Sequence, residues 1–397
     1  MKKSLIALAA LSAASAFAQS SVTVYGRFDA GFTRDSGGPA ATPSQSRLDS
    51  GIAGGSRLGF RGVEDLGSGL KANFVMETGI CGDSNENSTP ASSGNGVGNA
   101  AGFCTGGNSF MGREARVGLS GGFGALDLGR QYTPAFSVLN TLDPFGTGTA
   151  GTITNLFDST GGYGAPAANT GNPRMNNTVK FSTANFGGFT ASVAYGFGEV
   201  AGNSSARRTA GFNLQYANGP IYVGFGYHDA KGSVPSAAIP AGFTSSVASG
   251  GLVITPTAAV PAGAQDYRKN ALVGATYDFG PAKAHFAYGT TKNTVAQGAL
   301  ATGTNNGNGR NVMLGVSAPL GAGRLMASYI RHDDKGVNNF DADQLGIGYS
   351  YALSKRTSLY TAYAKINNKN GSLYTVGNAG NSGIGNSAFN LGVAHTF

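Results

Sequence analysis

Charged residues stand at alternating positions in several segments of this 397-residue chain. Arg27 and Asp29 lie two residues apart, Arg57 and Arg61 lie four apart, and Arg116 alternates with apolar neighbours. In an extended strand, side chains two residues apart share one face. These charges therefore gather on faces opposite the apolar ones. Fixed charges arranged in this way act on ions through their electric field and need no bond-making chemistry.

Two glycine-rich segments resemble catalytic or nucleotide-binding motifs but lack the context that such sites need. Residues 118–122 fit a nucleophile elbow, yet no helix pattern follows them. Residues 146–151 fit a dinucleotide-binding pattern, yet no βαβ unit surrounds them. Alternation brings no Ser, His and acid together, and the four histidines lack metal-ligand spacing. We expect no enzyme, no cofactor and no metal site.

The composition indicates a large all-β protein rich in turns. The chain has 65 glycines and only 48 charged residues (28 Lys and Arg plus 20 Asp and Glu), which disfavours packed helices. Its mean hydropathy of −0.09 is too low for a helical membrane protein. With 23 Phe and 16 Tyr it is too aromatic for a disordered chain. Although the net charge is +8, the basic residues are scattered, so we expect no nucleic-acid partner.

The first 18 residues are predicted to be a signal peptide. Lys2 and Lys3 form a basic start, residues 5–11 are apolar, and residues 16–18 form a small-x-small cleavage site. The apolar stretch is well short of the roughly 20 residues that span a bilayer. We therefore expect an exported chain whose residues 19–397 form a single domain.

Alternation of apolar with polar or small residues recurs along the mature chain. It is clear in residues 22–33, 221–228, 271–279 and 345–353, whereas no stretch of 18 apolar residues occurs. Membrane-spanning barrels show this pattern because their strands face lipid on one side and water on the other. The sequence thus predicts strands that cross a membrane.

Short and long connections alternate along the chain, as in a barrel whose two rims face different compartments. The short turns lie at 64–69, 121–124, 185–188, 218–220, 279–281, 320–323 and 354–356. The long connections lie near 34–52, 79–109, 134–173, 201–207, 231–267, 292–309, 333–339 and 368–385. Seven hairpins plus one strand at each end predict a 16-stranded antiparallel barrel with short periplasmic turns and long extracellular loops. A soluble sandwich would not need this regular asymmetry.

Several motifs, in order and spacing, resemble the general porins of Gram-negative outer membranes. They are Val24-Tyr25-Gly26-Arg27-Phe28-Asp29, residues 56–62 with 64–67, Gly129-Arg130-Gln131-Tyr132, residues 353–357 and the terminal His395-Thr396-Phe397. The resemblance implies a homotrimer of water-filled barrels, each with a third long loop folded into the lumen. It also implies that Phe397 is a signal read by the outer-membrane assembly machinery, and that lipid and lipopolysaccharide surround the protein.

The resemblance and the alternation together predict a pore constriction with a basic wall. By similarity, Arg27, Arg57, Arg130 and Lys180 match the family's basic ladder, and alternation adds Arg61 and Arg116. Arg130 shares its parity with two leucines, so a β-bulge must turn it inward.

An acid on the inserted loop is expected to oppose this basic wall. Asp143 matches the family's position, whereas the second acid that is common in the family is missing, and Asp158 could replace it. Four to six basic groups against one or two acids predict a weak to moderate preference for anions. The predicted function is passive diffusion of small hydrophilic solutes and inorganic ions. The alternatives are a substrate-selective channel and an adhesin or structural barrel.

Cys81 and Cys104 both fall in the second long loop. An exported protein crosses an oxidising compartment, so we expect a disulfide that stabilises the fold by about 3 kcal/mol. Two cysteines without a nearby histidine are a poor metal site. Acidic pairs at 333–334 and 341–343 leave calcium binding at the outer rim open, although solvated loop charges are the favoured interpretation.

Overall fold

The computed structural model describes residues 21–38, 43–83, 111–157, 173–231, 267–294, 309–336, 339–379 and 383–397, together with the backbone of 242–248 and 251–257. The predicted signal peptide, Cys104 and Asp158 lie outside the described residues. What the sequence indicates for them stays a prediction.

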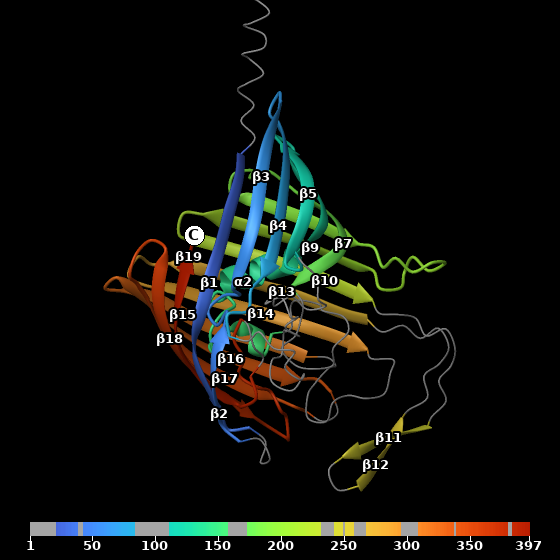
Figure 1. Ribbon diagram of the computed structural model, residues 1–397, viewed down its shortest axis with the longest axis vertical. Coiled ribbons are helices and arrows are strands. Elements are labelled where there is room, and N and C mark those ends of the chain that lie inside the picture. Colours follow the sequence, from blue (N-terminus) through green and yellow to red (C-terminus); the bar gives the residue numbers. More distant parts are fainter. Residues whose placement is uncertain are drawn as a thin grey trace, which may run out of the picture.

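Within the described residues, seventeen strands form one antiparallel sheet that closes into a ring (Figure 1). The first half of the sheet consists of β1 (Ser21–Ser36), β2 (Gln45–Ser50), β3 (Arg57–Gly67), β4 (Leu70–Gly79), β5 (Glu114–Gly121), β6 (Gly124–Tyr132), β7 (Arg174–Ser182), β8 (Phe189–Gly196) and β9 (Thr209–Asn218). The second half consists of β10 (Ile221–Lys231), β13 (Tyr267–Asp278), β14 (Lys283–Thr294), β15 (Gly309–Leu320), β16 (Gly323–Asp334), β17 (Ala342–Ala352), β18 (Thr357–Asn368) and β19 (Ser387–Thr396). A separate hairpin joins β11 (Gly242–Ala248) to β12 (Gly251–Thr257).

The ring closes at β1, which pairs with β19 on one side. On its other side β1 pairs with β2 along residues 30–35 and with β3 along residues 21–27. β2 and β3 are therefore one barrel strand interrupted at residues 51–56. Counted in this way the barrel has sixteen strands, which confirms the prediction.

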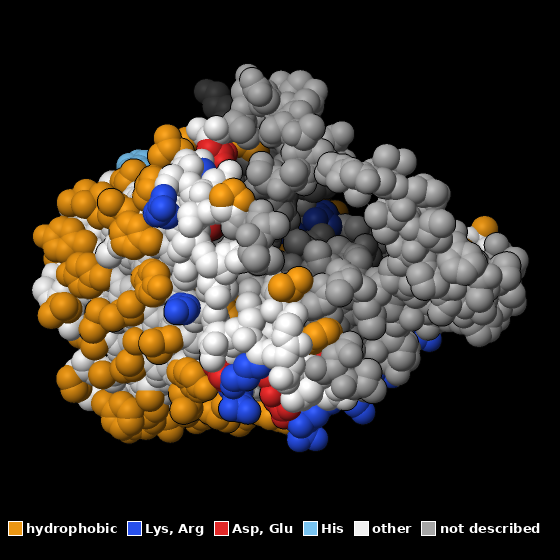
Figure 2. Space-filling view, turned by 90° about the horizontal axis from the view of Figure 1, so that it is seen from below, with side chains coloured by type: hydrophobic (Ala, Val, Ile, Leu, Met, Phe, Trp, Pro, Cys, Tyr) orange, Lys and Arg blue, Asp and Glu red, His pale blue; other side chains and the backbone are white. Residues whose placement is uncertain are grey.

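The predicted alternation sets the two faces of the wall. On β17, Leu345 is 64 % exposed on the outer face, while Gly346 and Gly348 face inward. On β5, Val117 is 57 % exposed, on the face opposite Arg116. Hydrophobic side chains accordingly gather on the part of the outer wall that lies at the left of Figure 2. In that view a Lys or Arg side chain is visible deep in the opening.

The seven predicted short turns all connect neighbouring strands. Two of the tightest are Gly122-Phe123, between β5 and β6, and Gly219-Pro220, between β9 and β10. Gly219 has a φ of +54°, which glycine adopts without strain. Within the described residues, no helix is long and apolar enough to cross a membrane.

The third long loop enters the lumen through helix α2 (Pro134–Leu142). Thr133 caps the helix by accepting the Phe136 N–H at 3.1 Å, and Pro134 occupies the first turn, where a missing N–H costs nothing. Its buried face is formed by residues spaced three or four apart, namely Ala135, Val138, Leu139 and Leu142. This face packs on β8, β9, β10, β13 and β14 from inside the barrel (Figure 1).

Beyond α2 the loop follows the inner wall through a short 3₁₀ helix, η2 (Ile153–Asn155), along a row of inward glycines. A Cβ at Gly274 would lie 2.5 Å from Leu142, and one at Gly346 would lie 3.0 Å from the Cα of Gly151. The same close approach occurs at seven positions, which are Gly224, Gly226, Gly274, Gly289, Gly315, Gly346 and Gly348. These residues, hereafter the glycine path, leave room for the loop only because they lack side chains.

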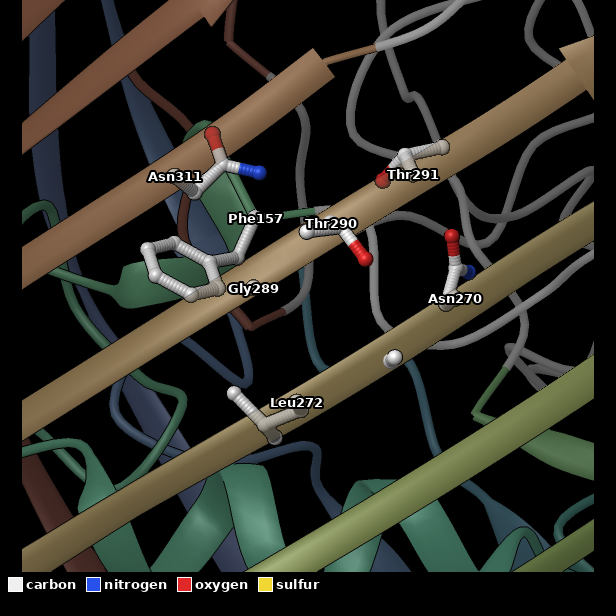
Figure 3. Close-up of a pocket in the computed structure, with 8 residues that line it drawn as sticks. Phe157, Asn270, Leu272, Gly289, Thr290, Thr291 and Asn311 are labelled. Carbon is white, nitrogen blue, oxygen red and sulfur yellow. The ribbon is translucent and has the colours of Figure 1, made fainter.

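The loop ends its described course at Phe157. Figure 3 shows Phe157 against the inner wall, beside Leu272 and over Gly289. A Cβ on Gly289 would lie 3.0 Å from the Phe157 ring. Phe157, Leu272 and the buried face of α2 belong to one apolar cluster inside the barrel, and this cluster holds the loop in place.

Candidate functional site

The strands β1 and β3 to β7 present a charged wall to the lumen. Arg27 pairs with Asp29 at 2.9 Å, and Arg57 approaches Glu77 at 3.4 Å. Further along, Arg116 pairs with Asp127 at 2.6 Å. Alternation had indicated that these three arginines face inward, and the structure places them on this common wall.

Arg130 reaches this wall through the irregularity that the sequence required. The pairing of β6 with β7 shifts register between Gly129 and Gln131, and Gly129 has a φ of +121°. The Arg130 guanidinium donates to the Gly112 carbonyl at 2.6 Å and to the side chain of Asn176. A bulge here changes which face receives the next side chain.

The two other predicted basic residues contact aromatic residues of the same wall. Lys180 Nζ lies 3.4 Å from the backbone carbonyl of Tyr132. Arg61 is exposed and its guanidinium carbon lies 5.2 Å from the centre of the Tyr25 ring, in a cation–π arrangement. Both stay on the inward face of their strands.

Two further arginines on the wall, Arg113 and Arg174, are not indicated by the sequence pattern. Arg113 donates to the Tyr132 hydroxyl at 3.0 Å and to Glu77 at 2.7 Å. Arg174 lies over the Tyr132 ring, with its guanidinium carbon 4.3 Å from the ring centre, and donates to the same hydroxyl. Arg113 precedes β5 and Arg174 opens β7, so neither has enough flanking alternation to indicate its direction.

Within the part of the chain that the structure describes, the acids that face these arginines come from the wall itself, and Asp143 of the inserted loop is not one of them. They are Asp29, Glu77, Glu114 and Asp127, and each contacts a basic residue of β1 or β3 to β6 or of the segment before β5. The eight basic residues on the same part of the wall are Arg27, Arg57, Arg61, Arg113, Arg116, Arg130, Arg174 and Lys180. Among these twelve residues, eight positive minus four negative charges leave an excess of four. The position of Asp127 between two outward leucines was a usable sequence signal.

Asp143 has a different place from the one that the sequence indicated. It is only 4 % exposed, and its carboxylate accepts backbone N–H groups from Phe145 at 3.0 Å, Thr147 at 2.8 Å and Ile153 at 3.1 Å. It therefore folds the tip of the loop and does not present its charge to the basic wall. An acid at a position that matches a family motif can serve either purpose, and alternation gives no information about a loop residue.

Burial raises the pKa of Asp143 to about 6, although the three N–H groups and nearby Arg324 pull it down. The unfolded value is 3.8, so between about pH 4 and pH 6 the folded chain holds this proton more tightly than the unfolded chain does. The contribution of Asp143 to stability is thus present at low pH and is lost as the pH rises through about 6.

We expect the loop of the wild-type protein to resist protease better at pH 5 than at pH 8. In Asp143→Asn this difference should disappear, and if the difference persists, another group causes it.

The chain terminus completes the barrel. The backbone of Phe397 exchanges two hydrogen bonds with Gly26 of β1, at 3.0 and 3.1 Å, and its ring is half exposed against Gly26 on the outer face. Cys81 lies two residues after the end of β4, while Cys104 lies outside the described residues, so their pairing stays a prediction.

A closed sixteen-stranded barrel with an apolar outside, a charged lumen and an inserted loop defines an outer-membrane channel. The chain belongs to the Gram-negative porin family, whose sequence profile matches residues 4–371. It is similar to outer membrane porin protein 32 of Delftia acidovorans, with 35 % identity over 381 residues, 94 % of this chain and 91 % of that protein. An outer membrane porin of Bordetella pertussis is 30 % identical over 413 residues, covering 92 % and 94 % of the two chains.

Among solved structures, the chain resembles an anion-selective porin from Comamonas acidovorans. The TM-score is 0.71 and the identity 31 %, covering 96 % of this chain and all of the other. The resemblance to general porins expected from the sequence motifs is thereby confirmed, as are the fold and the outer-membrane location.

Proposed function

We propose that this porin is a passive diffusion channel for small hydrophilic solutes and ions, with a preference for anions. The observation that carries the proposal is the excess of four positive charges among the twelve charged residues named above on the wall of β1 and β3 to β7. Fixed charge of one sign along a narrow aqueous path raises the local concentration of counter-ions. The similar Comamonas protein is described as anion-selective, in keeping with this charge balance.

Planar bilayer recording tests the proposal directly. Purified protein should produce discrete, water-filled channel currents, and the reversal potential in a potassium chloride gradient should have the sign of chloride preference. Clear cation preference would contradict the selectivity, and folded protein without conductance would favour an adhesin or structural barrel. Saturable block by one solute would identify a substrate-selective channel.

We further propose a homotrimer embedded in outer-membrane lipid and lipopolysaccharide. The many exposed hydrophobic side chains of the outer face, which gather at the left of Figure 2, are suited to lipid and to neighbouring copies of the chain. The exposed ring of Phe397 at the terminal strand supports recognition by the assembly machinery. Crosslinking in detergent tests the trimer, and removal of Phe397 should reduce the amount of assembled protein in the outer membrane.

A further inference from the structure

The interruption between β2 and β3 folds into the lumen. Ile52, the second of residues 51–56, is fully buried and packs against Tyr360 and Ala394 on the inner faces of β18 and β19. Gly31 on β1 gives it room, because a Cβ there would lie 3.1 Å from the Ile52 side chain. A break in a barrel strand thus becomes an inward projection with its own apolar anchor.

Two loops that are far apart in the sequence form hydrogen bonds with this projection. The Ile52 carbonyl accepts the N–H of Thr149, in the third loop, at 2.7 Å. The same carbonyl accepts the N–H of Ala379, in the loop after β18, at 3.2 Å. The two loops also bond directly, because Asn155 Oδ1 accepts the Gly377 N–H at 3.0 Å.

The contact with the third loop is close enough to need glycine. A Cβ on Gly148 would lie 2.2 Å from the carbonyl oxygen and 3.1 Å from the Cα of Ala53. These are backbone atoms that cannot move aside as a flexible side chain can. The tip of the loop is therefore seated on the projection at backbone-to-backbone distance.

The buried carboxylate of Asp29 binds both the inward projection at residues 51–56 and Arg27 of the basic wall. Asp29 is 0 % exposed and accepts the Ala53 N–H at 3.0 Å, the Tyr360 hydroxyl at 2.5 Å and the Arg27 guanidinium at 2.9 Å. The backbone of Asp29 also bonds Gly51 at 2.7 Å. The position of the loop tips and that of Arg27 thus depend on the same group.

We propose that residues 51–56 are an internal strut that fixes the third loop and the last loop as one unit at a set distance from the basic wall, with Asp29 as its positioning residue. This inference rests on the proposed channel function. It adds the element that keeps the width of the pore constant. Loss of the strut should therefore replace a single stable open-channel conductance by several fluctuating conductances.

Gly148→Ala tests the strut with the smallest possible change. The added methyl group collides with Ala53, so the tip of the third loop should move away from residues 51–56. The single open-channel conductance should then be replaced by several conductances with increased current noise. Gly122→Ala is the matched control, because a Cβ there meets nothing within 4 Å and its φ is not in the left-handed region. The control should record as wild type. Gel mobility of the unheated protein checks that both variants fold.

A second pair of variants separates positioning from general destabilisation. Tyr360→Phe removes one hydrogen bond from Asp29 without changing charge, so noise should rise while the reversal potential stays constant. Asp29→Asn removes one negative charge beside Arg27, so noise and anion preference should both rise. If all three strut variants fold and record as wild type, the strut is refuted while the channel stands. If the wild type itself does not conduct, the proposed function fails first.

Discussion

Replacement of Arg61, Arg130 and Arg174 by glutamate is expected to reverse the ion preference of the channel. The wall acids pair with Arg27, Arg57, Arg113 and Arg116, and the triple replacement keeps all four of these arginines. Each substitution changes the wall charge by two, and the excess of four becomes a deficit of two. Glutamine at the same positions would lower the excess to one, which should leave only a weak anion preference.

The size of the effect follows from simple electrostatics. A unit charge about 7 Å from a passing ion contributes about 0.6 kcal/mol in water, or roughly a factor of three in local concentration. Six units of charge should therefore change the permeability ratio by tenfold or more at low salt. The change should shrink at 1 M salt, where screening acts over about 3 Å. Reversal potentials at two salt concentrations measure both expectations.

The matched control carries the same change of net charge on the outside of the barrel. Arg310, Arg331 and Lys365 are exposed and share their strand faces with outward Val312, Tyr329 and Tyr363. Their replacement by glutamate should leave the reversal potential unchanged. If this outer triple variant shifts selectivity as much as the inner one, the filter does not lie on the wall of β1 and β3 to β7.

Asp143→Ala is expected to unfold the tip of the inserted loop while the barrel stays closed. Three backbone N–H groups lose their acceptor, and a buried donor left without a partner costs about 1–3 kcal/mol. The loop should therefore lose about 3 kcal/mol or more of its local stability. We expect faster protease cleavage within residues 143–153 and irregular currents, with unchanged β content by circular dichroism.

Asp143→Asn provides the graded comparison. Its single amide oxygen can still accept the two N–H groups that now share Oδ2, those of Thr147 and Ile153, so its loop should be less sensitive to protease than that of the alanine variant. Equal cleavage rates in wild type and Asp143→Ala would show that the carboxylate does not hold the loop.

The strands and turns were predictable because each is determined locally. Apolar side chains such as those of Leu345 and Val117 are favourable on the lipid side of a membrane-spanning strand. Because neighbouring side chains alternate, the side chain of Arg116 must then point into the lumen. Even the bulge at Arg130 followed from a conflict between its charge and its parity. These features need no knowledge of distant contacts.

The interior arrangement was not predictable from the same signals. Asp143 is surrounded by N–H groups of its own loop. Glu77 forms ion pairs with Arg57, on the neighbouring strand, and with Arg113, in the segment that precedes β5. The inward turn at Ile52 depends on loops almost 100 and more than 320 residues later in the chain. Such contacts depend on which segments share the lumen, and alternation within one strand carries no information about that.

The glycine path has a consequence for how this protein tolerates change. Saturation mutagenesis should show inward positions such as Gly274 and Gly346 as intolerant of every replacement, although they bear no charge and contact neither lipid nor, through a side chain, any permeating ion. A survey that scores positions by chemical character would rank them as dispensable. Natural selection on this channel is therefore expected to preserve the absence of side chains along the glycine path as strongly as it preserves the arginines of the opposite inner wall.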